Sequence, residues 1–109
     1  MTLVELKKLL DQTGYPVAYN HFTATTNNPV PSPPFIVYMT PSQSNFLADN
    51  KAYTKINNVT VELYTNYKDL AAEQTLESLF DENEISWDAD EVYIETEKLY
   101  QRIYEIGVI

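Results

Sequence analysis

The chain has 109 residues, 44% of them hydrophobic, so we expect one domain, residues 1–109, with a single modest core. It has no cysteine, which excludes disulfides, thiolate nucleophiles and cysteine-ligated zinc. Sixteen acidic against seven basic residues give a net charge of −9, which repels phosphate backbones, so we expect no direct binding to nucleic acid. No stretch has the length of a membrane span or the pattern of a signal peptide, which indicates a soluble protein that is not exported.

The negative charge is concentrated in one part of the chain. Residues 62–97 hold twelve acidic residues and one basic residue, Lys68, which nets −11, whereas the remainder nets +2. We therefore expect surfaces of opposite sign on the folded domain.

Residues 2–14 have the pattern of a capped amphipathic helix. Thr2 and Glu5 form a capping box at its start, and Gly14 is placed to end it in a left-handed turn. One face of this helix carries Leu3, Leu6, Leu9 and Leu10. We expect about three turns of helix with the leucines buried.

Two extended segments follow. Residues 17–22 favour a strand, and we expect its His21 to be a hydrogen-bonded strand residue and not a catalytic base. Residues 35–39 are apolar on both sides, which predicts a central strand buried on both faces. Between them, residues 23–34 are uncharged and rich in proline. This loop is either disordered, a simple connection or an arm that contacts a partner.

Asn57 and Asn58 favour a type I′ turn and predict a hairpin over residues 51–64. In that register the core-side pairs are Ile56 with Val59, Thr54 with Val61 and Ala52 with Leu63. The outward pairs are Lys55 with Thr60, Tyr53 with Glu62 and Lys51 with Tyr64.

Residues 70–80 predict a second helix, capped by Asp69 or Asn66. Its apolar stripe consists of Ala72, Leu76, Leu79 and Phe80. Asp69, Glu73 and Glu77 stack on another face, which we expect to be exposed to solvent. Residues 81–84 predict a solvated exit turn, and residues 85–87 either a short strand or a plug that buries Trp87.

Residues 91–95 and 99–106 predict a final hairpin that turns at 96–98. An even loop length places Val92, Ile94, Leu99 and Ile103 on one face, with Gln101 as a polar exception that suggests an edge position. The outward face then carries Glu91, Tyr93, Glu95, Tyr100, Arg102 and Tyr104. The outward tyrosines, with Tyr53 and Tyr64, either contact other proteins or lie under helices. The element order predicts an α+β domain with two helices on one face of a mainly antiparallel sheet.

No pattern typical of catalysis is present. The chain has two glycines and one histidine, too few for a nucleophile elbow with its triad or for a phosphate-binding loop. Residues 88–91 resemble the start of a calcium loop, but the sixth position is not glycine and the twelfth is Leu99. We therefore expect no enzyme, no catalytic residue, no cofactor and no metal.

Five segments resemble the tail-terminator, or tail-completion, proteins of long-tailed phages and prophages of Gram-positive bacteria. They are TGYPVAY (13–19), PPFIVY (33–38), NFLADNKAY (45–53), VELYT (61–65) and EKLYQRIYEI (97–106). The resemblance covers nearly the whole chain, and its motifs are structural. It implies a small α+β subunit that forms a ring, usually six-fold, at the head-proximal end of the tail tube. The ring stops tube growth and presents a surface to the head-tail connector proteins.

The resemblance thus implies the protein itself and the tail tube protein as partners, and a place in the virion, reached from the host cytoplasm during assembly. A ring contact needs two complementary patches, which the uneven charge offers. The candidate interface residues are Lys7, Lys8, Lys51, Tyr53, Lys55, Glu73, Glu77, Tyr93 and Arg102. Acidic residues would also suit a lumen through which DNA passes.

Two other functions fit the same residues. A neck protein of the head-tail connector would form rings that bind the portal side. An acidic DNA mimic would inhibit a host nuclease as a monomer or dimer. The sequence leaves these alternatives open.

Overall fold

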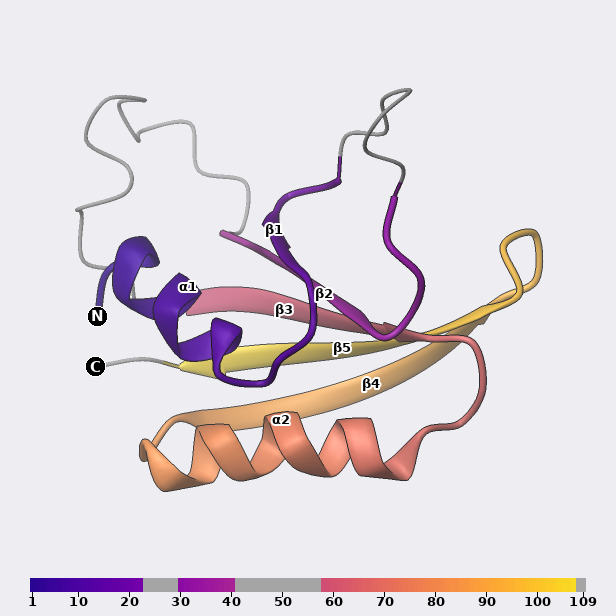
Figure 1. The fold of residues 1–109 in the computed structure, drawn as a ribbon. Coiled ribbons are helices and arrows are strands. Elements are labelled where there is room, and N and C mark those ends of the chain that lie inside the picture. The colour runs from indigo at the N-terminus through magenta and orange to yellow at the C-terminus, as the bar shows by residue number, and fades with distance from the viewer. Residues whose placement is uncertain (23–29, 41–57, 108–109) are drawn as a thin grey trace.

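The computed structural model describes residues 1–22, 30–40 and 58–107. The elements are α1 (Leu3–Asp11), β1 (Val17–Tyr19), β2 (Phe35–Met39), β3 (Asn58–Thr65), α2 (Leu70–Glu82), β4 (Ser86–Ile94) and β5 (Leu99–Gly107). The strands form one sheet in the order β1-β2-β3-β5-β4, in which β1 and β2 are parallel and all other neighbours antiparallel (Figure 1). The predicted α+β class is confirmed.

The core lies between one face of the sheet and the two helices. Apolar side chains of α1 and α2 form a single buried cluster with alternate residues of β2, β3 and β5. Successive side chains of a strand point to opposite faces, so burial of Val59, Val61 and Leu63 identifies the face that the helices cover. The other face, called the open face below, is covered by no helix in the described part of the chain.

Both predicted helix starts are confirmed. Thr2 Oγ1 accepts a hydrogen bond from the Glu5 backbone N–H at 3.2 Å, and the Thr2 N–H donates to the Glu5 carboxylate at 2.8 Å. At the second helix, the Asp69 carboxylate accepts from the Ala72 N–H at 3.0 Å, so Asp69 is the cap and Asn66 is not. Gly14 has a φ of +84°, the left-handed conformation that glycine adopts without strain.

The second helix is longer than predicted and changes the expected exit turn. It continues to Glu82, so only part of residues 81–84 lies outside it. Of the two alternatives for residues 85–87, the strand is correct, since β4 begins at Ser86. Trp87 is half-buried against the core, and its indole N–H donates to Asp81 at 2.9 Å.

The first strand is shorter than predicted. Asn20 has a φ of +69°, which turns the chain away from the sheet directly after β1. His21 therefore lies outside the strand and is exposed, so its assignment as a strand residue is wrong. The central strand β2 is confirmed, with four of its five residues buried. Of the proline-rich loop, residues 23–29 lie outside the described residues.

The predicted hairpin over residues 51–64 is only partly described, because residues 51–57 lie outside the described residues. Its cross-strand pairs to residues 60–64 are wrong, since both edges of β3 are occupied there: Val61, for example, lies between Tyr38 and Tyr104. The pairs excluded in this way are Thr54 with Val61, Ala52 with Leu63, Lys55 with Thr60, Tyr53 with Glu62 and Lys51 with Tyr64.

The final hairpin has the predicted parity but the opposite orientation. Ile94 pairs with Leu99 across a four-residue connection, as an even loop requires. However, Tyr104 is fully buried beneath α2, and Val92 is 45% exposed on the open face. The face predicted to point outward thus points to the helix, because α2 supplies partners for its polar atoms. Gln101 is on an interior strand, not at an edge, and donates to the Tyr64 hydroxyl at 2.9 Å.

Two leucines of α2 test this placement of the core. Leu76 is fully buried and Leu70 is 68% exposed. We expect Leu76→Ala to lower the free energy of unfolding by about 2–5 kcal/mol, because it leaves a cavity. The matched variant Leu70→Ala should change it by less than about 0.5 kcal/mol. Urea denaturation measures both, and equal losses would contradict the described orientation of α2.

Candidate functional site

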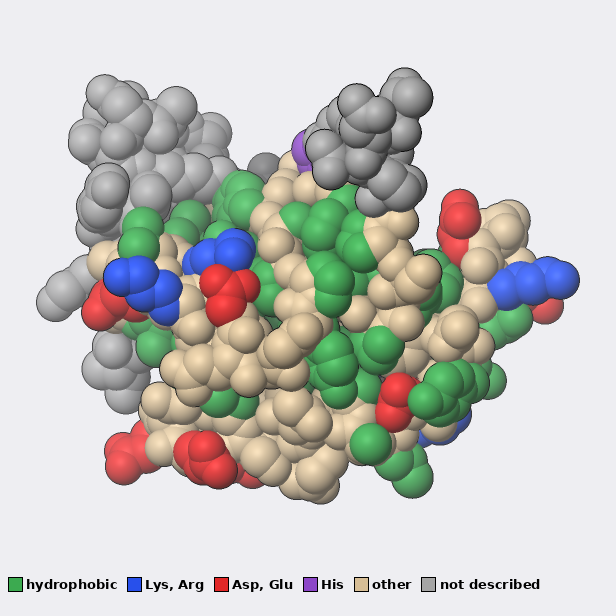
Figure 2. Space-filling model, in the orientation of Figure 1, with side chains coloured by type: hydrophobic (Ala, Val, Ile, Leu, Met, Phe, Trp, Pro, Cys, Tyr) green, Lys and Arg blue, Asp and Glu red, His purple; other side chains and the backbone are tan. Residues whose placement is uncertain are grey.

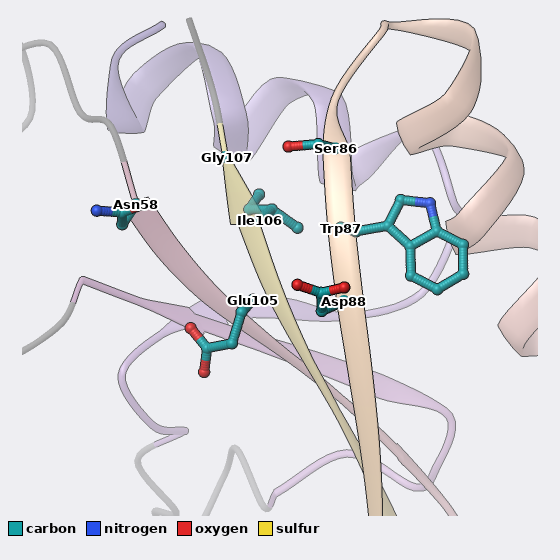
Figure 3. A pocket seen from close by; sticks show the side chains of 7 residues that line it. All are labelled: Asn58, Ser86, Trp87, Asp88, Glu105, Ile106 and Gly107. Atoms are coloured by element: carbon teal, nitrogen blue, oxygen red, sulfur yellow. The ribbon is translucent and has the colours of Figure 1, made fainter.

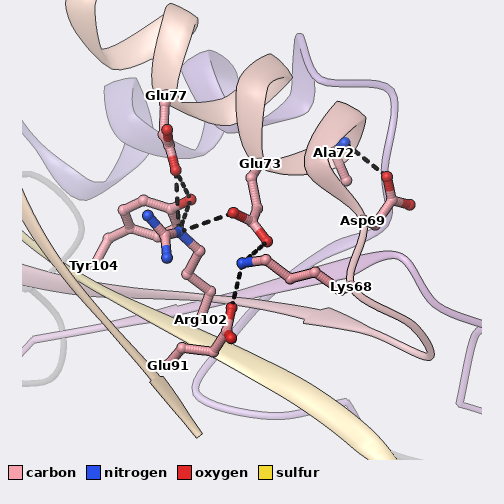
Figure 4. Close-up of polar contacts among 8 residues, drawn as sticks. All are labelled: Lys68, Asp69, Ala72, Glu73, Glu77, Glu91, Arg102 and Tyr104. Carbon is pink, nitrogen blue, oxygen red and sulfur yellow. Dashed lines mark hydrogen bonds and ion pairs between the residues drawn. The ribbon is translucent and has the colours of Figure 1, made fainter.

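A cluster of polar side chains joins α2 to the sheet. The Arg102 guanidinium of β5 donates to the Glu77 carboxylate at 3.0 Å and contacts the Tyr104 hydroxyl at 2.9 Å (Figure 4). The Tyr104 hydroxyl donates in turn to Glu77 at 2.6 Å. These three side chains, with Glu73, Lys68 and Glu91, are called the α2–sheet network below.

Lys68 and Glu73 extend this network along the helix. The Lys68 ammonium lies 2.8 Å from Glu73 and 2.6 Å from Glu91 of β4, so it bridges the helix and the outer strand. Glu73 also lies 3.4 Å from the Arg102 guanidinium. The acidic groups of this part of α2 therefore have cationic partners within the chain.

This arrangement overturns the expected exposure of the acidic face of α2. Asp69 and Glu73 are buried, at 9% and 8% exposure, and Glu77 is half-buried. The face turns inward because Arg102 and Lys68 compensate its charge, and a buried carboxylate is tolerated only when it is paired. Lys68, the single base within the acidic stretch, is the sequence feature that could have indicated that some of these acids are paired within the chain.

Burial also changes the acidity of two tyrosines. The pKa of the Tyr104 hydroxyl is raised well above its usual range, first by burial and then by its hydrogen bond to Glu77. The pKa of Tyr64, on the open face, is raised to about 12 by burial and by its hydrogen bond to Glu62. Both hydroxyls therefore act as neutral donors in these contacts.

The candidate interface residues fall into separate places. Glu73, Glu77 and Arg102 are brought together inside the α2–sheet network, where little of their charge is left for a neighbour. Lys7 pairs with Asp11 one helical turn away at 2.8 Å, and Lys8 is exposed on the same helix. Figure 2 shows basic side chains over α1, with acidic side chains next to them. Tyr93 is 47% exposed on β4 and its ring contacts Tyr100. Lys51, Tyr53 and Lys55 lie outside the described residues.

Two acidic groups without cationic partners lie on the outer strand β4. Asp88 and Asp90 alternate along it, so both point to the open face, and both are exposed. Within the described residues neither has a hydrogen-bond or ion-pair partner. Nothing in the sequence singled out these two aspartates, because residue type alone does not separate acids that have a cationic partner in the fold from acids that have none.

A hollow of about 460 Å³ lies beside Asp88. It is lined by Asn58, Ser86, Trp87, Asp88, Glu105, Ile106 and Gly107, where β3, β5 and β4 meet (Figure 3). Asp88 and Glu105 are direct cross-strand neighbours, which gives the hollow a negative wall. A Cβ on Gly107 would lie 2.9 Å from the Ser86 hydroxyl, so the absent side chain keeps this end open.

In the part of the chain that the structure describes, no three acidic, histidine or cysteine residues are grouped so that they could hold a metal ion. Over the same residues, no helix has the length and apolar character to cross a bilayer. Comparison with known family models, curated proteins and solved structures found no match.

Loss of Arg102 tests the α2–sheet network. We expect Arg102→Gln to lower the free energy of unfolding by about 2–3 kcal/mol, because Glu73 and Glu77 lose their shared partner while Glu73 stays buried and Glu77 half-buried. The matched variant Lys7→Gln removes an exposed pair on α1 and should cost only about 0.3–0.5 kcal/mol. Denaturation of both variants measures the difference, and similar losses would show that the network contributes no more than a surface pair.

The raised pKa of Tyr104 gives a second prediction. An unfolded tyrosine ionises near pH 10, and a folded pKa above that value means that the folded state holds the proton more tightly. This contribution to stability is complete below pH 10 and declines as the pH rises above it. At pH 11 we expect Tyr104→Phe to leave the tyrosinate absorbance of the folded protein unchanged but to lower that of the urea-unfolded protein. A loss of absorbance in the folded protein would contradict the burial of this hydroxyl.

Proposed function

We propose that this protein is a structural subunit that forms a ring at the head-proximal end of a phage tail tube. There it stops growth of the tube and provides a surface for head joining, within the virion. The segment-by-segment resemblance described above supports this proposal, and so does the α+β fold with both helices on one face.

The distribution of surface charge is the observation that carries the proposal. Glu73 and Glu77 of α2 have cationic partners inside the domain, whereas Asp88 and Asp90 on the outer strand have none within the described residues. Val92, at 45% exposure, follows them on the open face, and Tyr93, at 47% exposure, points to the opposite face of the same strand. Exposed apolar and charged groups on one strand are suited to contacts with other proteins. The exposed Lys8 on α1 is of opposite sign, and a ring contact requires two such different patches on each subunit.

A phage that lacks this gene tests the proposal. We expect its particles to have overlong or unconnected tails in electron micrographs, and a copy of the wild-type gene supplied in trans should restore normal tails. The reason is that tube polymerisation continues when nothing occupies the growing end.

Two outcomes would overturn this assignment. Filled heads without tails would point to a neck protein of the head-tail connector. Normal virions would point to an inhibitor that mimics DNA. Purified protein added to growing tail tubes gives an independent check, since a terminator shortens the tubes and is seen as a ring at one end.

A further inference from the structure

The outer edge of β4 has backbone groups available for another strand. β4 pairs with β5 along all nine of its residues, and its opposite edge has no strand partner in the described ranges (Figure 1). In an antiparallel pair, every second residue directs its N–H and C=O away from its partner. Such an edge is a ready template for an added strand.

A second copy of β4 is a poor occupant of this edge. Antiparallel pairing of two copies about the strand centre would place Asp90 opposite Asp90, and a shift of register in either direction would place Asp88 opposite Asp90 or Glu91 opposite Glu91. Like charges directly opposite each other destabilise a strand pair. The strand thus disfavours pairing with itself in each of these registers.

We propose that this edge binds an extended basic segment of a different protein by strand addition. Asp88 and Asp90 point to the open face without cationic partners in the described residues, so lysine or arginine opposite them would neutralise their negative charge. Val92 and Ile94 follow on the same face, so the partner carries apolar residues opposite them. This inference stands on β4 alone and does not rest on the role in a phage tail.

The hollow beside Asp88 gives a place to the basic side chain that lies opposite Asp88. An added strand lies about 4.8 Å from β4, and a lysine is long enough to lean from it over the open face. There it meets the carboxylates of Asp88 and Glu105 together with the Ser86 hydroxyl. Glu105 already accepts from the Thr60 hydroxyl at 3.1 Å, which holds it on this face.

The side chains on the other face of β4 do not require basic residues in the partner. Trp87 and Ala89 pack against the core, and Glu91 is already paired with Lys68. Small polar residues therefore suit the intervening positions of the partner. An antiparallel partner has its apolar positions first and its basic positions last, and antiparallel ladders are slightly the more stable kind.

A synthetic peptide tests the proposal on the whole protein. The probe is VTVTKTKT with blocked termini, and the matched control is VTVTETET. We expect the first peptide to slow hydrogen exchange at alternate β4 amides in NMR spectra and to bind more weakly as salt rises. No slowing at β4, or equal binding of the two peptides, would overturn the proposal.

Two charge variants locate the contact. Asp90→Lys should weaken binding of VTVTKTKT about tenfold, whereas Glu82→Lys, an equal charge change at the end of α2, should weaken it less than twofold. Equal weakening would overturn the proposal in favour of unspecific attraction. Slowed β4 exchange that depends on protein concentration, without peptide, would overturn it in favour of a second copy. The peptide pair keeps the test decisive if Asp90→Lys fails to fold, and neither result depends on the phenotype of a phage that lacks the gene.

Discussion

The orientation of the whole C-terminal half depends on the Arg102 guanidinium and its two partners, Glu77 and Tyr104. A half-buried cation at a sheet surface requires acceptors, and α2 supplies them from its inward-facing acidic side. This pairing fixes which face of the β4–β5 hairpin turns to the core. Because Tyr104 and Arg102 point inward, Val92 and Ile103 point to the open face. The exposed character of the outer strand is thus a consequence of the network on its other side.

The features that were predictable from the sequence are set by residues close together in the chain. The capping box of α1, the buried leucine face and the even loop after Ile94 each depend on residues within a few positions of one another, and all three are as expected. The orientation of the final hairpin was not predictable, because the partner that neutralises Arg102 is 25 positions away. Likewise, β3 pairs with two strands distant in sequence, and no local turn signal reports that both its edges are occupied.

The candidate site shows the same limit. Composition identified the acidic stretch correctly, but it could not show which of its residues have cationic partners in the fold. Glu73 and Glu77 lie on a regular helical face that is typical of solvent exposure, yet the structure encloses them with Lys68 and Arg102. Asp88 and Asp90 belong to the same stretch and stay without partners, since they point to the open face, whereas Glu91 on the same strand faces α2 and pairs with Lys68. The face to which a side chain points, and not residue type, decides which acids of β4 have a cationic partner.

The two edge strands of the sheet, β1 and β4, differ in length. β1 has three residues and ends where Asn20 turns away, whereas β4 has nine. A strand that joins this domain therefore meets a long, charged margin on one side and a short, uncharged one on the other. We therefore expect a strand that extends this sheet to join it at β4 and not at β1.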